Sequence, residues 1–96
     1  MKNITVMIPC YNEEQGISKV IKAIPRQKLK KAGFNVEVLV VDNNSKDKTT
    51  QVAEKAGAKV LFEGKQGKGH AIRTAFRNIP KKTDYVVMLD GDDTYR

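Results

Sequence analysis

The sequence predicts an α/β fold: a Rossmann-like, mostly parallel sheet sandwiched by helices, in the order β-α-β-α-β-α-β. Short apolar runs that are typical of strands alternate with segments whose apolar residues recur at i, i+3, i+4 and i+7, the spacing of a helix. Apart from Glu37, the second and fourth runs are continuously apolar up to their closing aspartates, as expected for strands covered on both faces of a parallel sheet. This alternation predicts a doubly wound sheet with right-handed crossovers.

The predicted strands differ in composition. The first is β-branched and stops at Pro9, and the second and fourth are the long apolar runs. The third is shorter and carries Lys59, which favours a place at the edge of the sheet. In chain order the strands are expected over residues 4–9, 36–42, 58–62 and 85–90.

The segments between the strands repeat one helical template. Pro25 and Pro80 are expected to end the first and last helices, and the basic stretch 26–31 falls in the first helix-to-strand connection. The positions with this spacing are Ile17, Val20, Ile21 and Ile24, then Thr49, Val52, Ala53 and Ala56, then Ile72, Ala75, Phe76 and Ile79.

Residues that favour helix ends flank these segments. Asn12 with Gln15 predicts a capping box, Ser45 predicts an N-cap, and Gly57 predicts the left-handed residue just after a helix.

Length and charge restrict the class of protein. Ninety-six residues make one small domain or part of a larger one, and 40% hydrophobic with 30% charged residues is typical of a globular chain. The 18 basic and 11 acidic residues give a net charge of +7, which suits nucleic acid, an anionic membrane or phosphorylated ligands. The basic stretches lack the interleaved aromatic residues of a nucleic-acid groove, so no nucleic-acid partner is predicted. The single cysteine, Cys10, and the strand-like N-terminus favour a cytoplasmic location.

Ligands of open α/β sheets bind at the carboxyl ends of the strands, which selects the loops to examine. The last of them, "DGDDTY", places Asp90, Asp92 and Asp93 directly after an apolar run. Asp-x-Asp at a strand end offers hard oxygen ligands to Mg²⁺ or Mn²⁺, with substrate phosphates completing the coordination. The alternative is a solvated acidic turn.

The other carboxyl-end loops are "PCYNEE", "DNNSKDKT" and "EGKQGKGH". Asp42 either accepts hydrogen bonds from a ribose or base, or forms a turn. Glycines around Lys68 suit a phosphate at a helix N-terminus, and the alternative is a flexible basic loop. Tyr11 either stacks on a base or packs on a neighbour. Glu13 either binds a ribose or favours the start of the helix. The residues around it favour the second alternative.

The sequence does not support a nucleophilic triad or either of two common nucleotide-binding loops. His70 has no serine or cysteine partner in a recognisable arrangement, so a nucleophilic triad is not predicted, and Cys10 is expected to be a small strand-end residue. The Walker A pattern is not matched, and no Gly-x-Gly-x-x-Gly follows the first strand.

The ordered motifs "VMIPCYNEE", "VEVLVVDNNSKDKT", "GKGHAI" and "DYVVMLDGDDTY" resemble the nucleotide-binding half of a family 2 glycosyltransferase of GT-A fold. The likeness is greatest to the dolichyl-phosphate mannosyltransferase-like and bacterial polyprenyl-phosphate sugar transferase group. Relatives often show "VDDGSxDGT" where this chain has "VDNNSKDKT", so Asn43, Asn44 and Lys48 depart from the pattern. This departure concerns the base contacts and the choice of nucleotide.

The resemblance implies a role for each matching residue. Asp92 would be the principal metal ligand and Asp90 would contact metal or ribose, while the role of Asp93 stays open. The implied nucleotide-binding residues are Pro9, Tyr11, Glu13, Asp42, Lys68 and Asp90.

The resemblance also implies an activity: metal-dependent, inverting transfer of a sugar from a nucleotide-diphosphate sugar of UDP or GDP type, with a polyprenyl phosphate as one possible acceptor. Residues 1–96 would be the donor-binding part, ending after the Asp-x-Asp motif, with the acceptor site and any general base beyond it. The full-length parent would then be cytoplasmic or peripheral at a membrane, and the fragment would self-associate through an open sheet edge. The alternatives are a nucleotide-binding module without catalysis and another α/β enzyme such as a nucleotidyltransferase.

Overall fold

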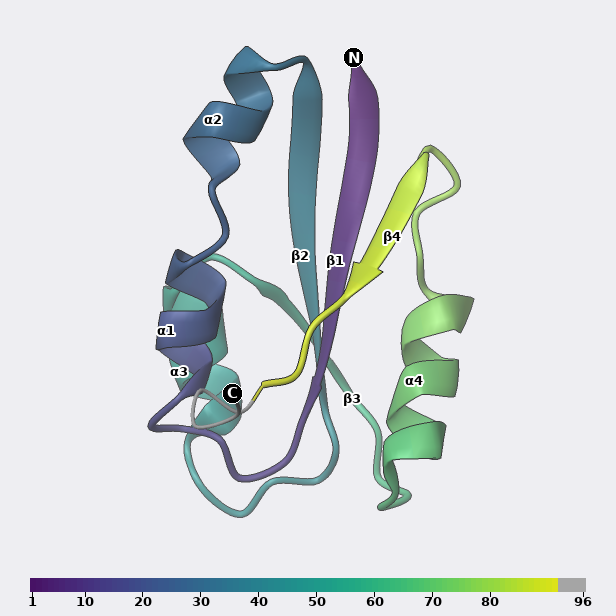
Figure 1. Ribbon diagram of the computed structural model, residues 1–96. Coiled ribbons are helices and arrows are strands. Elements are labelled where there is room, and N and C mark those ends of the chain that lie inside the picture. Colours follow the sequence, from purple (N-terminus) through teal and green to yellow (C-terminus); the bar gives the residue numbers. More distant parts are fainter. Residues whose placement is uncertain (92–96) are drawn as a thin grey trace.

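The computed structural model describes residues 1–91 and contains a four-stranded parallel sheet in the order β3-β2-β1-β4 (Figure 1). The predicted α/β class is therefore confirmed, and so is the edge position of the third strand. The elements are β1 (Lys2–Cys10), α1 (Ile17–Lys22), α2 (Arg26–Lys31), β2 (Phe34–Asp42), α3 (Thr49–Lys55), β3 (Lys59–Phe62), α4 (Lys68–Arg77) and β4 (Tyr85–Met88).

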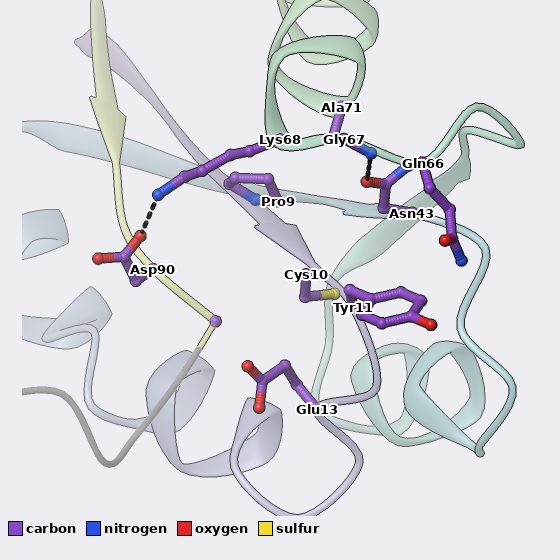
Figure 2. A pocket seen from close by; sticks show the side chains of 11 residues that line it. Pro9, Cys10, Tyr11, Glu13, Asn43, Gln66, Gly67, Lys68, Ala71 and Asp90 are labelled. Carbon is purple, nitrogen blue, oxygen red and sulfur yellow. Dashed lines mark hydrogen bonds and ion pairs between the residues drawn. The ribbon is translucent and has the colours of Figure 1, made fainter.

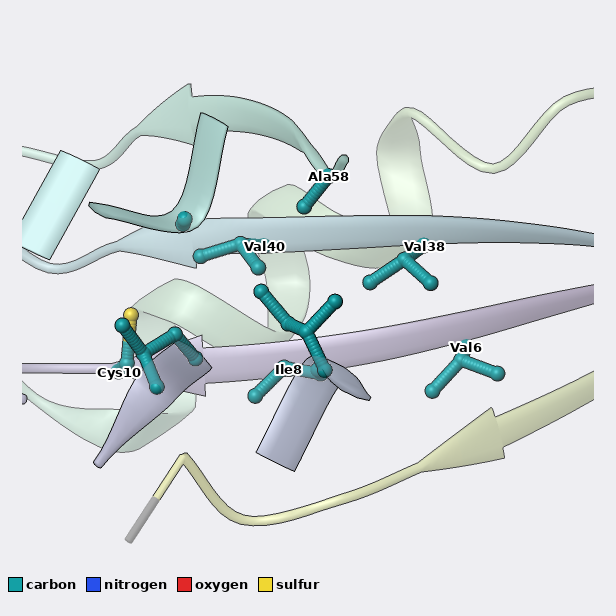
Figure 3. Close-up of a cluster of buried hydrophobic side chains, with 9 residues drawn as sticks. Val6, Ile8, Cys10, Val38, Val40 and Ala58 are labelled. Carbon is teal, nitrogen blue, oxygen red and sulfur yellow. The ribbon is translucent and has the colours of Figure 1, made fainter. Parts of the chain in front are cut away.

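The sheet separates two hydrophobic layers, because successive strand residues point to opposite faces. On one face, alternate residues of β1 and β2 pack against α1 and α3 (Figure 3). On the other face, Met7, Leu39 and Val41 pack against Ala71 and Ala75 of α4. The two central strands pair along their whole length, from Lys2 opposite Phe34 to Cys10 opposite Asp42. Their carboxyl ends therefore reach the same edge of the sheet.

Two expected helix caps are wrong, and one helix was not expected. The stretch 26–31 lies in the predicted connection between the first helix and the second strand, but it forms the helix α2, because Pro25 suits a helix start and the residues after it are good helix formers. Asn12 forms no capping box, since α1 begins at Ile17 after Gly16. Ser45 is no N-cap, because α3 begins at Thr49 and Lys48 precedes it. The side chains of Asn12 and Ser45 instead accept hydrogen bonds from each other's loop. Gly57, with φ of +97°, does follow α3 in the predicted left-handed conformation.

The outer strand β4 differs from its prediction. The run 85–90 was expected to be covered on both faces, but the strand ends at Met88 and its residues are 41–53% exposed. It pairs with β1 on one side, from Ile4 opposite Tyr85 to Met7 opposite Met88, and lies at the sheet edge of the described residues. An apolar sequence pattern does not by itself say which strand has neighbours on both faces. Self-association through this edge stays a prediction.

None of the helices within residues 1–91 is long and apolar enough to cross a bilayer.

Candidate functional site

A pocket of about 540 Å³ opens at the carboxyl edge of the sheet (Figure 2). Its walls come from the ends of β1 and β2, the loop before α4, the first turns of α4 and the residues after β4. This is the edge at which parallel α/β sheets bind ligands. The lining residues are Pro9, Cys10, Tyr11, Glu13, Asn43, Gln66, Gly67, Lys68, Ala71, Asp90 and Gly91.

The end of β1 forms one wall of the pocket, with the ring of Tyr11 and the carboxylate of Glu13 beside it (Figure 2). Tyr11 is 43% exposed, so a face of its ring is open to a ligand. The backbone N–H of Glu13 donates to Oγ1 of Thr49 over 2.9 Å, which fixes the start of the loop. The loop can therefore present an aromatic ring and an acid from a rigid backbone.

Asn12 connects this wall to the neighbouring loop by a reciprocal pair of hydrogen bonds. Its backbone N–H donates to Oγ of Ser45 over 2.8 Å, and its Oδ1 accepts from the backbone N–H of Lys46 over 2.8 Å. Asn12 has φ of +53°, a left-handed conformation that asparagine tolerates better than most residues. The side chains that the sequence suggested as helix caps thus join two loops of the pocket.

Lys68 and Asp90 face each other across the mouth of the pocket. Nζ of Lys68 donates to Oδ1 of Asp90 over 2.9 Å, and the two side chains are 60% and 45% exposed. An ion pair this exposed contributes little to stability, about 0–1 kcal/mol. The pair therefore places one cation and one anion within reach of an incoming ligand at small energetic cost.

Asn43 holds the loop that precedes α4. Its Nδ2 donates to the carbonyl oxygens of Glu63 and Lys65, over 3.1 Å and 2.7 Å. Its Oδ1 accepts from the N–H of Gly67 over 2.9 Å. Gly67 has φ of +132°, which only glycine adopts readily, and Lys68 begins the helix directly after it.

Asp42 lies behind the pocket and not in its lining. It is 5% exposed, and its carboxylate accepts hydrogen bonds from the backbone N–H of Ser45 and the hydroxyl of Thr50. These hydrogen bonds agree with the alternative that Asp42 forms part of a turn. A contact between Asp42 and a base or ribose stays a prediction.

Cys10 lies at the base of the pocket, 5% exposed. Burial, with smaller contributions from the carboxylates of Asp42, Glu13 and Asp47, raises the pKa of the Cys10 thiol to about 12. A thiol that stays protonated is a poor nucleophile. Gly91 fits against it because a Cβ there would lie 2.8 Å from the Cys10 Cβ, so the chain after β4 requires glycine at this point.

The structure thus brings together most of the side chains that the sequence singled out, namely Pro9, Tyr11, Glu13, Lys68 and Asp90, and leaves Asp42 outside the lining. Asp92 and Asp93 lie outside the described residues. Within residues 1–91, no three His, Cys, Asp or Glu side chains gather as metal ligands. His70 is half-buried in the first turns of α4 and is not among the lining residues.

Sequence reasoning did not assign Asn43 or Gln66 to the pocket. For Asn43 a signal was present, since it follows a strand end and departs from the pattern of similar proteins. Gln66 carries no such signal, because its place depends on how the loop before α4 is held.

The model of the family "Glycosyl transferase family 2" matches residues 5–96, so the chain belongs to this family. The chain is 45% identical over 93 residues to Protein RfbJ of Shigella flexneri, covering 97% of this chain and 67% of that protein. It is 38% identical over 93 residues to the dolichyl-phosphate hexose transferase of Haloferax volcanii, covering 97% of this chain and 38% of that protein.

A solved structure has the same fold over nearly the whole chain. Glucosyl-3-phosphoglycerate synthase from Mycobacterium tuberculosis, in complex with Mn²⁺, uridine diphosphate and phosphoglyceric acid, matches with a TM-score of 0.78 at 31% identity, covering 95% of this chain and 33% of that one. The same enzyme has been solved with Mg²⁺ and uridine diphosphate, with a TM-score of 0.77 at 29% identity, covering 95% of this chain and 34% of that one. The present chain therefore spans about a third of the length of these structures.

Proposed function

We propose that the pocket is the donor site of an enzyme that transfers a sugar from a nucleotide-diphosphate sugar to an acceptor. The observation that carries this proposal is the meeting of Tyr11, Glu13, Lys68 and Asp90 around one pocket at the carboxyl edge of the sheet. These side chains supply what such a ligand needs: an aromatic face for a base, an acid for sugar hydroxyls and a cation for phosphate. Membership of the family and the uridine diphosphate bound to similar structures support it.

The residues present fit a divalent cation. The Asp90 side chain is 45% exposed and offers a carboxylate beside the pocket, and Asp92 follows it in the Asp-x-Asp pattern. Oxygen ligands of this kind suit Mg²⁺ or Mn²⁺, which usually retain waters and share substrate phosphates. We infer that Asp90 and Asp92 hold the ion, which when bound stabilises the negative charge of the departing nucleotide diphosphate.

The chain's own residues orient the donor and favour departure of the diphosphate. Lys68 lies at the start of α4, so its ammonium group can move from Asp90 to a phosphate oxygen and stabilise charge that develops there. The ring of Tyr11 gives a flat surface against which a base can stack. Burial of Cys10, Ala71 and Gly91 at the pocket base limits the space for water beside the diphosphate.

The acceptor is proposed to be a polyprenyl phosphate. One similar protein is a dolichyl-phosphate hexose transferase, and this chain carries a net charge of +7, which favours an anionic membrane surface. A phosphate acceptor is already anionic and attacks the anomeric carbon without a general base, with inversion. The enzyme would then act as a cytoplasmic protein that is peripheral at the membrane.

Titration calorimetry with uridine diphosphate and guanosine diphosphate, each with and without Mn²⁺, tests the donor site. We expect at least one of the two to bind, and to bind more tightly when Mn²⁺ is present. Failure of both nucleotides to bind at millimolar concentration contradicts the proposal. Binding that Mn²⁺ does not strengthen contradicts the metal role alone.

A further inference from the structure

The side chain of Asn43 makes contacts that the proposed donor site leaves unexplained. It is 5% exposed, and all three of its side-chain hydrogen bonds go to one segment, the loop from Glu63 to Gly67 that joins β3 to α4. Both of its N–H groups donate to carbonyl oxygens, and its oxygen accepts a backbone N–H. Every polar atom of the amide therefore has a partner within a single loop. Figure 2 shows one of these contacts, the hydrogen bond between Asn43 and Gly67.

The arrangement requires an amide and excludes a carboxylate. The loop presents two carbonyl oxygens, those of Glu63 and Lys65, and one N–H, that of Gly67, to this one side chain. An ionised aspartate has no donor, so it would place an oxygen against both carbonyl groups in a nearly dry environment. An ionised acid at position 43 is therefore incompatible with the loop conformation seen here.

Neighbouring contacts hold the same loop. The backbone oxygen of Asp42 accepts from the N–H of Glu63 over 2.9 Å, and Nδ2 of Asn44 donates to the oxygen of Gly64 over 3.4 Å. On the far side, the hydroxyl of Thr74 on α4 donates to the Glu63 carboxylate. Together with the backbone N–H of Lys65 within the loop, it lowers the pKa of Glu63. The loop is thus held between the end of β2 and the helix α4.

The position of Lys68 depends on this loop. Gly67 is the residue before α4, and its N–H is the donor to Asn43, so the hydrogen bond fixes the point at which the helix begins. Lys68 is the first residue of that helix, and its side chain reaches Asp90 across the pocket. Without the hydrogen bonds from Asn43, the loop and the backbone of Lys68 would be free to move.

We propose that Asn43 is a positioning residue of the donor site, which holds the loop 63–67 so that Lys68 faces the diphosphate of the ligand. The part of this inference that concerns the ligand rests on the proposed function, whereas the part that concerns the loop does not. The proposal has one consequence for binding. Replacing the amide of residue 43 by an acid should weaken binding of the diphosphate and leave binding of the nucleoside unchanged.

Hydrogen exchange tests the loop. In Asn43→Asp, the amide of Gly67 should lose about tenfold or more in protection, relative to its intrinsic rate, near neutral pH. Protection should partly return at about pH 5, because burial against two carbonyl oxygens raises the pKa of a carboxyl at this position, and the protonated form regains one donor. Asn35→Asp, the same change at an exposed position on β2, should leave the Gly67 amide unaffected. Unchanged protection in Asn43→Asp, or a loss that does not recover at low pH, overturns the proposal.

Nucleotide binding tests the consequence. With Mn²⁺ present, Asn43→Asp should weaken uridine diphosphate by about tenfold and uridine by less than about twofold. Equal weakening of both ligands means that Asn43 is merely structural, which overturns the positioning role. If the unmodified chain binds guanosine diphosphate in place of uridine diphosphate, guanosine diphosphate and guanosine replace the uridine pair in this test. If it binds neither nucleoside diphosphate, the proposed function fails while the exchange result for the loop still stands. Should Asn43→Asp unfold in a thermal melt, Asn43→Ser, which keeps one hydroxyl donor, is expected to show the same preference in a weaker form.

Discussion

Two aspartates lie at the carboxyl ends of β2 and β4, the strands on either side of β1, and their environments differ. Asp42 ends β2, is 5% exposed and accepts hydrogen bonds from the backbone of Ser45 and the hydroxyl of Thr50. Asp90 comes two residues after β4, its side chain is 45% exposed, and it pairs with Lys68. Both aspartates lie at the same edge of one sheet. The carboxylate of Asp42 is buried and hydrogen-bonded within the protein, whereas that of Asp90 is accessible to a ligand.

The difference follows from the neighbours of each strand. β2 lies between β1 and β3, and the loop after it folds back so that α3 supplies Thr50 beside the carboxylate. β4 pairs only with β1 among the described strands, and its residues remain exposed. A central position in the sheet leads to a buried acid with internal partners, whereas an outer position leaves the acid free to exchange its partner.

The largest expected effect is on stability. Asp42→Ala leaves the N–H of Ser45 and the hydroxyl of Thr50 without their acceptor, so we expect the free energy of unfolding to fall by about 3 kcal/mol. Asp90→Ala, the matched change at the other strand end, removes only an exposed ion pair and should cost less than about 1 kcal/mol. Urea unfolding monitored by circular dichroism measures both. Similar losses for the two variants would contradict the contrast between the two acids.

The next effect concerns the metal. Asp92→Ala should abolish the strengthening of uridine diphosphate binding by Mn²⁺, and Asp90→Asn should reduce it by about tenfold, because each removes an anionic oxygen ligand. Titration calorimetry with and without Mn²⁺ gives these values. Asp84→Asn, at the opposite end of β4, is the control and should not change them. Mn²⁺-supported binding that survives Asp92→Ala would make the ligand assignment wrong.

A smaller effect is expected at Lys68. Lys68→Ala should weaken uridine diphosphate by about tenfold and uridine hardly at all, because the ammonium group is proposed to contact phosphate only. Lys65→Ala is the matched control, since this lysine lies in the loop just before α4 but does not line the pocket. Equal loss of both ligands in Lys68→Ala would indicate a structural role for the lysine.

The smallest effect concerns the thiol at the base of the pocket. With its pKa raised to about 12, Cys10 should react very slowly with iodoacetamide at about pH 8 and rapidly once urea unfolds the chain. An unfolded thiol ionises near pH 8.5, so unfolding releases a proton above that pH and stability falls as pH rises towards 12. The expected loss is about 1 kcal/mol at about pH 9.5, and it should be absent from Cys10→Ala. Rapid alkylation of the folded chain would show that the thiol is accessible.

Much of the fold and the edge that carries the pocket follow from local pattern in the sequence. The apolar runs around Val38 and Val87 and the helical spacing from Ile17 identify the alternating elements, because burial on one or both faces imposes a period on the chain. The rule that ligands bind at the carboxyl ends of strands then selects the loops of Tyr11 and Lys68. Local pattern did not identify α2, because a proline that ends one helix can also begin the next.

What only the tertiary structure decided is the partner of each polar group at that edge. Asp42 accepts from Thr50 on a separate helix, Asn43 bonds residues 20–24 positions further along the chain, and Asp90 meets Lys68 from 22 positions away. Hydrogen bonds and ion pairs depend on distances of about 3 Å, which a sequence does not contain until packing of the two hydrophobic layers brings the loops together. The sequence by itself determined which residues reach the edge, and the packing decided which of them hold the loops and which line the pocket.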